Sequence, residues 1–304
     1  MAEQLDRQAV LEQLRNRSNW GRWGKDDQKG AANLITPEKR VAAAALVRSG
    51  RTVSLSRVYP KAPGHRNPNP AQHYIRLLDR GEGSGAMVDY YGIEYHGFVS
   101  THIDALCHIW SADGMWGGRD PAKVINTRDG STWGDIDQWR EGLITRGVLL
   151  DIPRFRKEPW VTYEKPVHGD ELARIADDQG IEVQPGDALI IYAGRDAWEE
   201  ANPDWTGFSG VRPGLHASCL KFIRDRDIAV LLFDHNEARP NEYGLAWTVK
   251  FVGAYYGVGT VNSVTLAPLA QACAEEGRYE FMLVISPLRV PGGSGSPVNP
   301  IAIF

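Results

Sequence analysis

The segment Ser100–His108 constrains this chain more than any other part of its sequence. It reads Ser-Thr-His-Ile-Asp-Ala-Leu-Cys-His, so two imidazoles and a carboxylate lie within nine residues, among apolar neighbours. If the segment is a strand, His102 and Asp104 point to the same face, because side chains alternate along a strand. His108 returns to that face if the chain turns at residues 105–106. The segment therefore predicts a functional site.

Imidazole nitrogen and carboxylate oxygen together suit zinc, manganese or ferrous iron. We therefore predict His102 and Asp104 as metal ligands, with His96 on the same strand face as a third ligand. His108 is the candidate for proton transfer, and His102, Asp104 and His108 could also form an acid–base set without a metal. The competing interpretation is one hydrogen-bonded core histidine and one surface histidine.

The segment resembles the H-x-G-T-H-x-D-x-P-x-H signature of the cyclase family, which contains bacterial kynurenine formamidases and isatin hydrolase. The resemblance runs nearly end to end, and residues 19–38 and 280–300 look like the longer bacterial branch of that family. It implies an α/β fold of the swivelling β/β/α type, in which a mixed sheet closes partly on itself and helices pack outside. It also implies a small cyclic or aromatic amide, lactone or imide as substrate, and a homodimer or homotetramer.

The chain departs from this signature at three positions. Phe98 stands in place of the first histidine, Ser100 in place of glycine, and Leu106 in place of proline. The family also places a histidine and an acidic residue late in the chain, whereas residues 244–262 contain neither. We therefore do not expect a two-metal site of the formamidase kind.

A second polar stretch, Asp234-His235-Asn236-Glu237, follows the apolar run 228–233. Side chains at the end of a buried strand often point into a pocket, so Asp234, His235 or Glu237 could reach the site. The alternative is a polar loop that caps the next element.

Composition excludes several classes of partner. The chain has 304 residues, a formal charge of -4 and a pI near 6.1, so no broad basic surface attracts nucleic acid or anionic membrane. Three scattered cysteines without C-x-x-C spacing fit a reducing compartment. Because the sequence shows neither a secretion signal nor an apolar run of membrane-spanning length, we expect a cytoplasmic enzyme that acts on a small molecule.

The remaining pattern predicts one catalytic domain, residues 36–304, preceded by an arm, residues 1–35. Apolar residues at helical spacing in 5–14 predict an amphipathic helix that has no obvious partner in its own domain and lies on a neighbouring surface, for which another subunit is a candidate. Thr36 and Pro37 mark a helix start, and Gly50 its end. Strands are expected at 53–55, 147–152, 188–192, 229–233 and 279–285, and helices at 169–179 and 215–225.

Aromatic residues are abundant near the histidines. We predict Phe98, Trp110 and Trp23 as lining of a substrate pocket, since an aromatic wall suits a flat organic substrate. Ordinary core packing is the alternative.

Three functions remain open at this point. The first is a hydrolase that uses a zinc- or manganese-activated water with a histidine acid–base group. The second is a metal-independent cyclase, dehydratase or isomerase that uses the same cluster. The third is an inactive binding protein of the same fold. The cost of keeping buried ionisable groups without a use argues against this third function.

Overall fold

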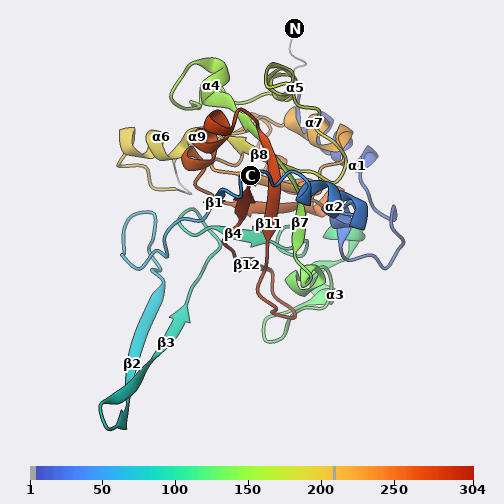
Figure 1. Ribbon diagram of the computed structural model, residues 1–304. Coiled ribbons are helices and arrows are strands. Elements are labelled where there is room, and N and C mark those ends of the chain that lie inside the picture. The colour runs from blue at the N-terminus through green and yellow to red at the C-terminus, as the bar shows by residue number, and fades with distance from the viewer. Residues whose placement is uncertain (1–4, 208–209) are drawn as a thin grey trace.

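A curled nine-stranded mixed sheet forms the centre of the molecule (Figure 1). The computed structural model describes residues 5–207 and 210–304. The strands of this sheet are β1 (Thr52–Ser54), β4 (His102–Asp104), β7 (Leu143–Asp151), β8 (Ala188–Tyr192), β9 (Val230–Phe233), β10 (Gly259–Asn262), β11 (Glu280–Ile285), β12 (Gly295–Pro297) and β13 (Ile301–Ile303). Their order is β1-β13-β11-β7-β8-β9-β10-β4-β12. The neighbours from β7 to β10 are parallel and the other pairs antiparallel, so the predicted mixed α/β fold is confirmed.

Short helices surround the sheet. They are α1 (Arg7–Asn16), α2 (Pro37–Ala44), α3 (Pro121–Val124), α4 (Ile152–Arg156), α5 (Gly169–Asp178), α6 (Arg195–Ala201), α7 (Cys219–Asp225), α8 (Val252–Tyr256) and α9 (Ala267–Glu276), with the 3-10 turns η1 (Gly30–Leu34), η2 (Trp116–Gly118), η3 (Ile136–Trp139) and η4 (Val249–Phe251). Within the described residues, no helix has the length and apolar character needed to cross a bilayer.

The central strands are buried on both faces. Along β7, Val148 and Leu150 contribute to one apolar cluster and Leu149 to another, because successive side chains point to opposite faces. Residues of α5 and α7 cover the first cluster, and residues of α9 cover the second. This two-sided burial explains why the strands at 188–192 and 229–233 read as continuous apolar runs.

Most elements expected from the sequence are present. The strands at 53–55, 147–152, 188–192, 229–233 and 279–285 correspond to β1, β7, β8, β9 and β11. Thr36 caps α2 by accepting a hydrogen bond from the Lys39 amide at 3.2 Å, but this helix ends at Ala44, before Gly50. The helix expected at 215–225 starts only at Cys219, because Leu215 forms bridges with strand-like neighbours instead.

The N-terminal helix α1 packs on its own chain. Val10 and Leu14 are fully buried in the first apolar cluster, and α1 contacts α8. Arg15 also pairs with Asp113 at 2.7 Å. The expectation that this arm has no partner in its own domain is therefore wrong, because α8 supplies the apolar surface. The arm gives no support to an oligomer.

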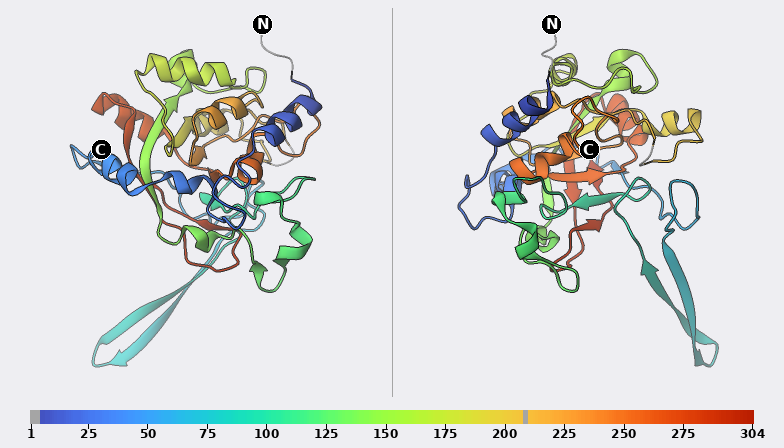
Figure 2. Two further views of the ribbon diagram at one scale, coloured as in Figure 1. Left: turned by 90° about the vertical axis from the view of Figure 1, so that its right-hand side faces the viewer. Right: turned by 180° about the vertical axis from the view of Figure 1, so that it is seen from behind.

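A long β-hairpin was not expected from the sequence. Strands β2 (Gln72–Gly81) and β3 (Ser84–Gly92) pair only with each other. Figures 1 and 2 show the hairpin projecting far from the body of the molecule. A separate small pair, β5 (Ile125–Asn126) and β6 (Gly130–Ser131), lies within the body.

We predict that Leu14→Ala lowers the free energy of unfolding by about 2–5 kcal/mol, because it leaves a cavity in a buried position. Urea denaturation would measure the change. Glu12→Ala on the exposed side of the same helix is the control, with an expected loss under about 0.5 kcal/mol. Equal, small effects of the two substitutions would show that α1 does not stabilise its own domain.

Candidate metal and acid–base site

Strand pairing brings the polar residues of the site to one face of the sheet. Asp104 on β4 lies opposite Thr260 of β10, and His102 lies opposite Asn262. Because residues two apart share a face, these four side chains lie together. On the other side of β4, Gly295 of β12 is the neighbour of Asp104.

One oxygen of the Asp104 carboxylate is held by three donors. Its Oδ2 accepts hydrogen bonds from Lys250 Nζ, from Thr260 Oγ1 at 3.0 Å and from Asn262 Nδ2 at 2.8 Å. Burial alone would raise the pKa of Asp104, but the Lys250 ammonium and the neighbouring imidazoles outweigh it and hold the pKa well below its usual range. Asp104 is therefore an ionised carboxylate in a buried position.

The other oxygen is where three imidazoles converge. Asp104 Oδ1 lies 3.1 Å from His96 Nδ1, 3.3 Å from His102 Nε2 and 3.7 Å from His108 Nε2. The rings of His96 and His108 stack with centroids 3.8 Å apart. The structure thus brings together the four residues that the sequence analysis selected as ligands and acid–base groups.

His96 reaches this oxygen by a different path from the one predicted. It lies in a bend after the hairpin and not on a strand, so the expected shared strand face is wrong. Its Nε2 lies 3.1 Å from Ser294 Oγ. A Cβ on Gly295 would stand 3.0 Å from the His96 ring and 2.4 Å from the Ile103 carbonyl oxygen, so glycine leaves the space for this ring.

The tautomer of His102 points to a cation between the ring and the carboxylate. Its Nδ1–H donates to the Ser100 carbonyl oxygen at 2.8 Å, so that Nε2 is the nitrogen of this ring that could bind a metal ion. This Nε2 lies 3.3 Å from Oδ1 of Asp104. Two electron-rich atoms at this distance repel each other unless a proton or a metal ion lies between them.

The donor set fits a divalent metal. One ligand atom each from His96, His102 and Asp104 lies within 4.8 Å of the others, and imidazole with carboxylate is a common zinc or manganese set. The hydrogen bond from His102 to a backbone carbonyl is the outer contact that metal-binding histidines usually have.

His108 differs from the other two histidines. Burial lowers its pKa to about 4, so the ring is neutral at neutral pH. Its side chain is 26% exposed, and its ring makes no hydrogen bond to another described residue. Its ring nitrogens are therefore the ones in the cluster that remain available to a substrate.

Sequence reasoning did not find Lys250, Thr260 or Asn262. Lys250 and Asn262 lie in the region where the resemblance leads one to expect a histidine and an acidic residue. Lys250 also donates to Asn262 Oδ1 at 2.9 Å. The one available signal was a lysine inside an otherwise apolar stretch; in the structure Lys250 is only 6% exposed.

The stretch 234–237 supports the site without entering it. Glu237 Oε2 accepts hydrogen bonds from the backbone amides of Thr248 and Lys250, at 2.8 and 3.2 Å, and so fixes the segment that carries the lysine. Asp234 accepts hydrogen bonds from the Ala193 and Arg195 amides, at 2.9 Å each, although burial raises its pKa to about 6. His235 packs edge-on against Trp198.

The residues predicted to line a substrate pocket are dispersed. Phe98 packs on Trp205 with ring centroids 5.4 Å apart, in an aromatic cluster that also contains Trp198. Trp198 and Trp205 line a cavity of about 660 Å³. Trp110 is 47% exposed.

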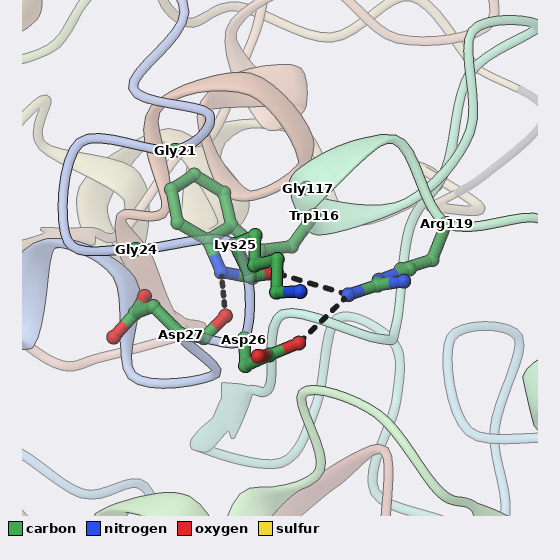
Figure 3. A pocket seen from close by; sticks show the side chains of 8 residues that line it. All are labelled: Gly21, Gly24, Lys25, Asp26, Asp27, Trp116, Gly117 and Arg119. Atoms are coloured by element: carbon green, nitrogen blue, oxygen red, sulfur yellow. Dashed lines mark hydrogen bonds and ion pairs between the residues drawn. The ribbon is translucent and has the colours of Figure 1, made fainter.

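Trp23 lies elsewhere, against Trp116, with ring centroids 6.2 Å apart. Trp116 borders the pocket in Figure 3, a cavity of about 350 Å³ that contains none of the clustered histidines. There Arg119 donates to the Lys25 carbonyl oxygen at 2.9 Å, and the Trp116 indole donates to that of Asp27 at 2.9 Å. These contacts join the N-terminal segment to the body, and we assign them no chemistry.

The mixed α/β fold of this chain matches that of solved cyclase-family structures. The sequence profile of the family described as Putative cyclase matches residues 36–238, so the chain belongs to the cyclase family. A solved structure of a novel cyclase is 30% identical, with a TM-score of 0.83, over 94% of this chain and 97% of that one.

Two isatin hydrolases share the fold at lower identity. Isatin hydrolase A from Ralstonia solanacearum is 19% identical with a TM-score of 0.54, over 88% of this chain and 98% of that one. Isatin hydrolase A from Labrenzia aggregata is 17% identical with a TM-score of 0.56, over 86% and 94%. A comparison with curated protein sequences gives no match.

We predict that Lys250→Met lowers the free energy of unfolding by about 3–5 kcal/mol, because it leaves the Asp104 carboxylate buried without its cation. The double variant Asp104→Asn/Lys250→Met removes both charges and should be more stable than Lys250→Met alone. Urea denaturation at pH 7 with a chelator present measures both. A double variant that is no more stable than Lys250→Met would contradict the pairing.

Proposed function

We propose that this protein is a metal-assisted hydrolase of a small cyclic or aromatic amide, lactone or imide. The observation that carries the proposal is the convergence of ligand atoms from His96, His102 and Asp104 within 4.8 Å of one another, a donor set that suits a divalent cation. Membership of the cyclase family and the fold shared with isatin hydrolases support the reaction class.

In this proposal His96, His102 and Asp104 hold zinc or manganese. A bound divalent metal lowers the pKa of a water ligand and polarises a carbonyl oxygen. Lys250 and Asn262 hold the opposite oxygen of Asp104, so the carboxylate stays ionised and fixed in orientation. Preorganised ligands of this kind reduce the reorganisation that accompanies the reaction.

His108 moves the proton in this proposal. Its Nε2 lies on the same side of Asp104 as the other imidazoles, and part of its ring is exposed. A neutral imidazole accepts a proton from the attacking water and then donates it to the leaving nitrogen or oxygen. The bond between the carbonyl carbon and that atom breaks, and the carboxylate product forms.

One observation favours a second candidate function. The Lys250 ammonium already contacts Asp104 and supplies a fixed positive charge in the buried site. With that charge in place, His102, Asp104 and His108 could catalyse cyclisation, dehydration or isomerisation without a metal. Metal content separates the two candidates.

Elemental analysis of protein purified without chelator or added metal tests the proposal. We expect about one zinc or manganese per chain, lost in His102→Ala and retained in His108→Ala. His65→Ala, an exposed histidine outside the cluster, is the control and should keep the metal. Absence of metal from active wild-type protein would favour the second candidate, and loss of metal from His108→Ala would make that residue a ligand.

Turnover provides a separate test of His108. With isatin, phthalimide and an N-formyl aromatic amine as probes, His108→Ala should lower kcat roughly 10²–10⁴-fold on any probe that the wild type hydrolyses. Opening of the ring or release of formate can be followed by absorbance or chromatography. Near-normal turnover by His108→Ala would remove its assigned role.

A further inference from the structure

Both ring nitrogens of His96 lie next to a polar side chain, which is true of no other imidazole in the candidate site. Its Nδ1 lies 3.1 Å from Asp104 Oδ1, and its Nε2 lies 3.1 Å from Ser294 Oγ. His102 instead uses a backbone carbonyl for its second nitrogen. Because His96 belongs to no strand, these two contacts and the stacking on His108 decide where its ring nitrogens point.

The backbone places Ser294 beside the carboxylate and holds it there. The Ser294 carbonyl oxygen accepts a hydrogen bond at 2.9 Å from the amide of Ala105, the residue after Asp104. One residue earlier, the Gly293 carbonyl oxygen accepts from the Ile136 amide at 2.8 Å. The Ser294 hydroxyl therefore has a fixed origin relative to the carboxylate, and it can hold the ring that lies between them.

A phenol continues the contacts of this hydroxyl. Burial raises the pKa of Tyr95, and a hydrogen bond with the Ser294 hydroxyl opposes this rise. Tyr95 Oη in turn donates to the Gly295 carbonyl oxygen at 2.9 Å. An imidazole, a hydroxyl, a phenol and a backbone carbonyl thus follow one another in a hydrogen-bonded chain that starts at His96.

The carbonyl at the end fixes the direction of this chain. A carbonyl oxygen only accepts, so the single proton of the Tyr95 phenol is donated to Gly295. The phenol oxygen then accepts the proton of the Ser294 hydroxyl, and the hydroxyl oxygen accepts from His96 Nε2–H. In this arrangement Nδ1, beside Asp104, is the nitrogen of the His96 ring that could bind a metal ion.

We propose that Ser294 and Tyr95 are positioning residues that present Nδ1 of His96 to the divalent metal. The inference rests on the proposed function, because it assumes that His96 is one of the metal ligands. A hydrogen bond from the second ring nitrogen fixes the orientation of a metal-binding imidazole and raises its basicity. His102 receives this support from the Ser100 backbone, whereas His96 receives it from side chains and is therefore open to substitution.

Metal affinity tests the role of the two residues without reference to turnover. Zinc binding to the chelator-treated full-length chain is measured at neutral pH by competition with a chromophoric chelator. Ser294→Ala should raise the Kd for zinc roughly 10–100-fold, the usual effect of removing an outer partner of a ligand. Tyr95→Phe should raise it by a smaller factor. The double variant should be no weaker than Ser294→Ala, because the phenol acts through the hydroxyl.

Ser296→Ala and Tyr59→Phe are the matched controls. The Ser296 hydroxyl, in the strand that follows, accepts from the Leu288 amide at 2.9 Å. Tyr59 donates to the Gly92 carbonyl oxygen at 3.1 Å. Each control removes a hydrogen bond of the same kind that does not reach His96, so the zinc affinity should equal that of the wild type. Thermal unfolding of the metal-free variants shows whether each is folded.

Nitrogen NMR of isotope-labelled histidine rings reads the tautomer directly and needs only the wild type. In the zinc-loaded protein we expect His96 to bind through Nδ1 and to carry its proton on Nε2. That proton should exchange with water faster in zinc-loaded Ser294→Ala, a change that a general loss of stability would not confine to one ring. Zinc bound through Nε2, or zinc bound without His96, overturns the inference.

The outcomes separate this inference from the function on which it rests. A wild type that binds no divalent metal contradicts the proposed metal-assisted hydrolase and the positioning role together. A wild type that binds zinc no more tightly than Ser294→Ala contradicts the positioning role alone. Equal losses of affinity in Ser294→Ala and Ser296→Ala would show a general effect on β12 and would also overturn that role.

Discussion

The carboxylate of Asp104 is the interaction on which the candidate site depends, because its two oxygens have separate sets of partners. Three donors from the late part of the chain saturate Oδ2, and three imidazoles from the motif surround Oδ1. The first set offsets the cost of burying the charge. The three imidazoles around Oδ1 are therefore not needed to stabilise the buried charge, and they can bind an ion or move a proton.

This division explains how a lysine and a metal site can share one carboxylate. Lys250 Nζ contacts Oδ2, whereas the three imidazoles surround Oδ1. Its charge repels further cations, so we infer room for one metal at most, held at Oδ1. Lys250 and Asn262 thus hold in place the carboxylate that lies among the candidate ligands.

The sequence predicted the local part of the site and missed the distant part. His102, Asp104 and His108 lie within seven residues, so strand alternation and one turn suffice to place them. Lys250 and Asn262 lie 146 and 158 residues from Asp104 and reach it only through the pairing of β10 with β4 and the packing of η4, which no local pattern specifies. The buried strands were predicted well because apolar runs report burial directly. The aromatic pocket was not, because tryptophan near a motif in sequence packs wherever apolar surface is available.

His96 connects the site to the hairpin. The other candidate ligands are fixed by β4, whereas His96 lies four residues after the end of β3 and is positioned by side-chain contacts to Ser294 and Asp104. Tyr95 beside it donates to the Gly295 carbonyl oxygen at 2.9 Å. The segment 93–96 is therefore held by β12 at one end and joined to the hairpin at the other. The position of His96, the third candidate ligand, therefore depends on the base of the β2–β3 hairpin.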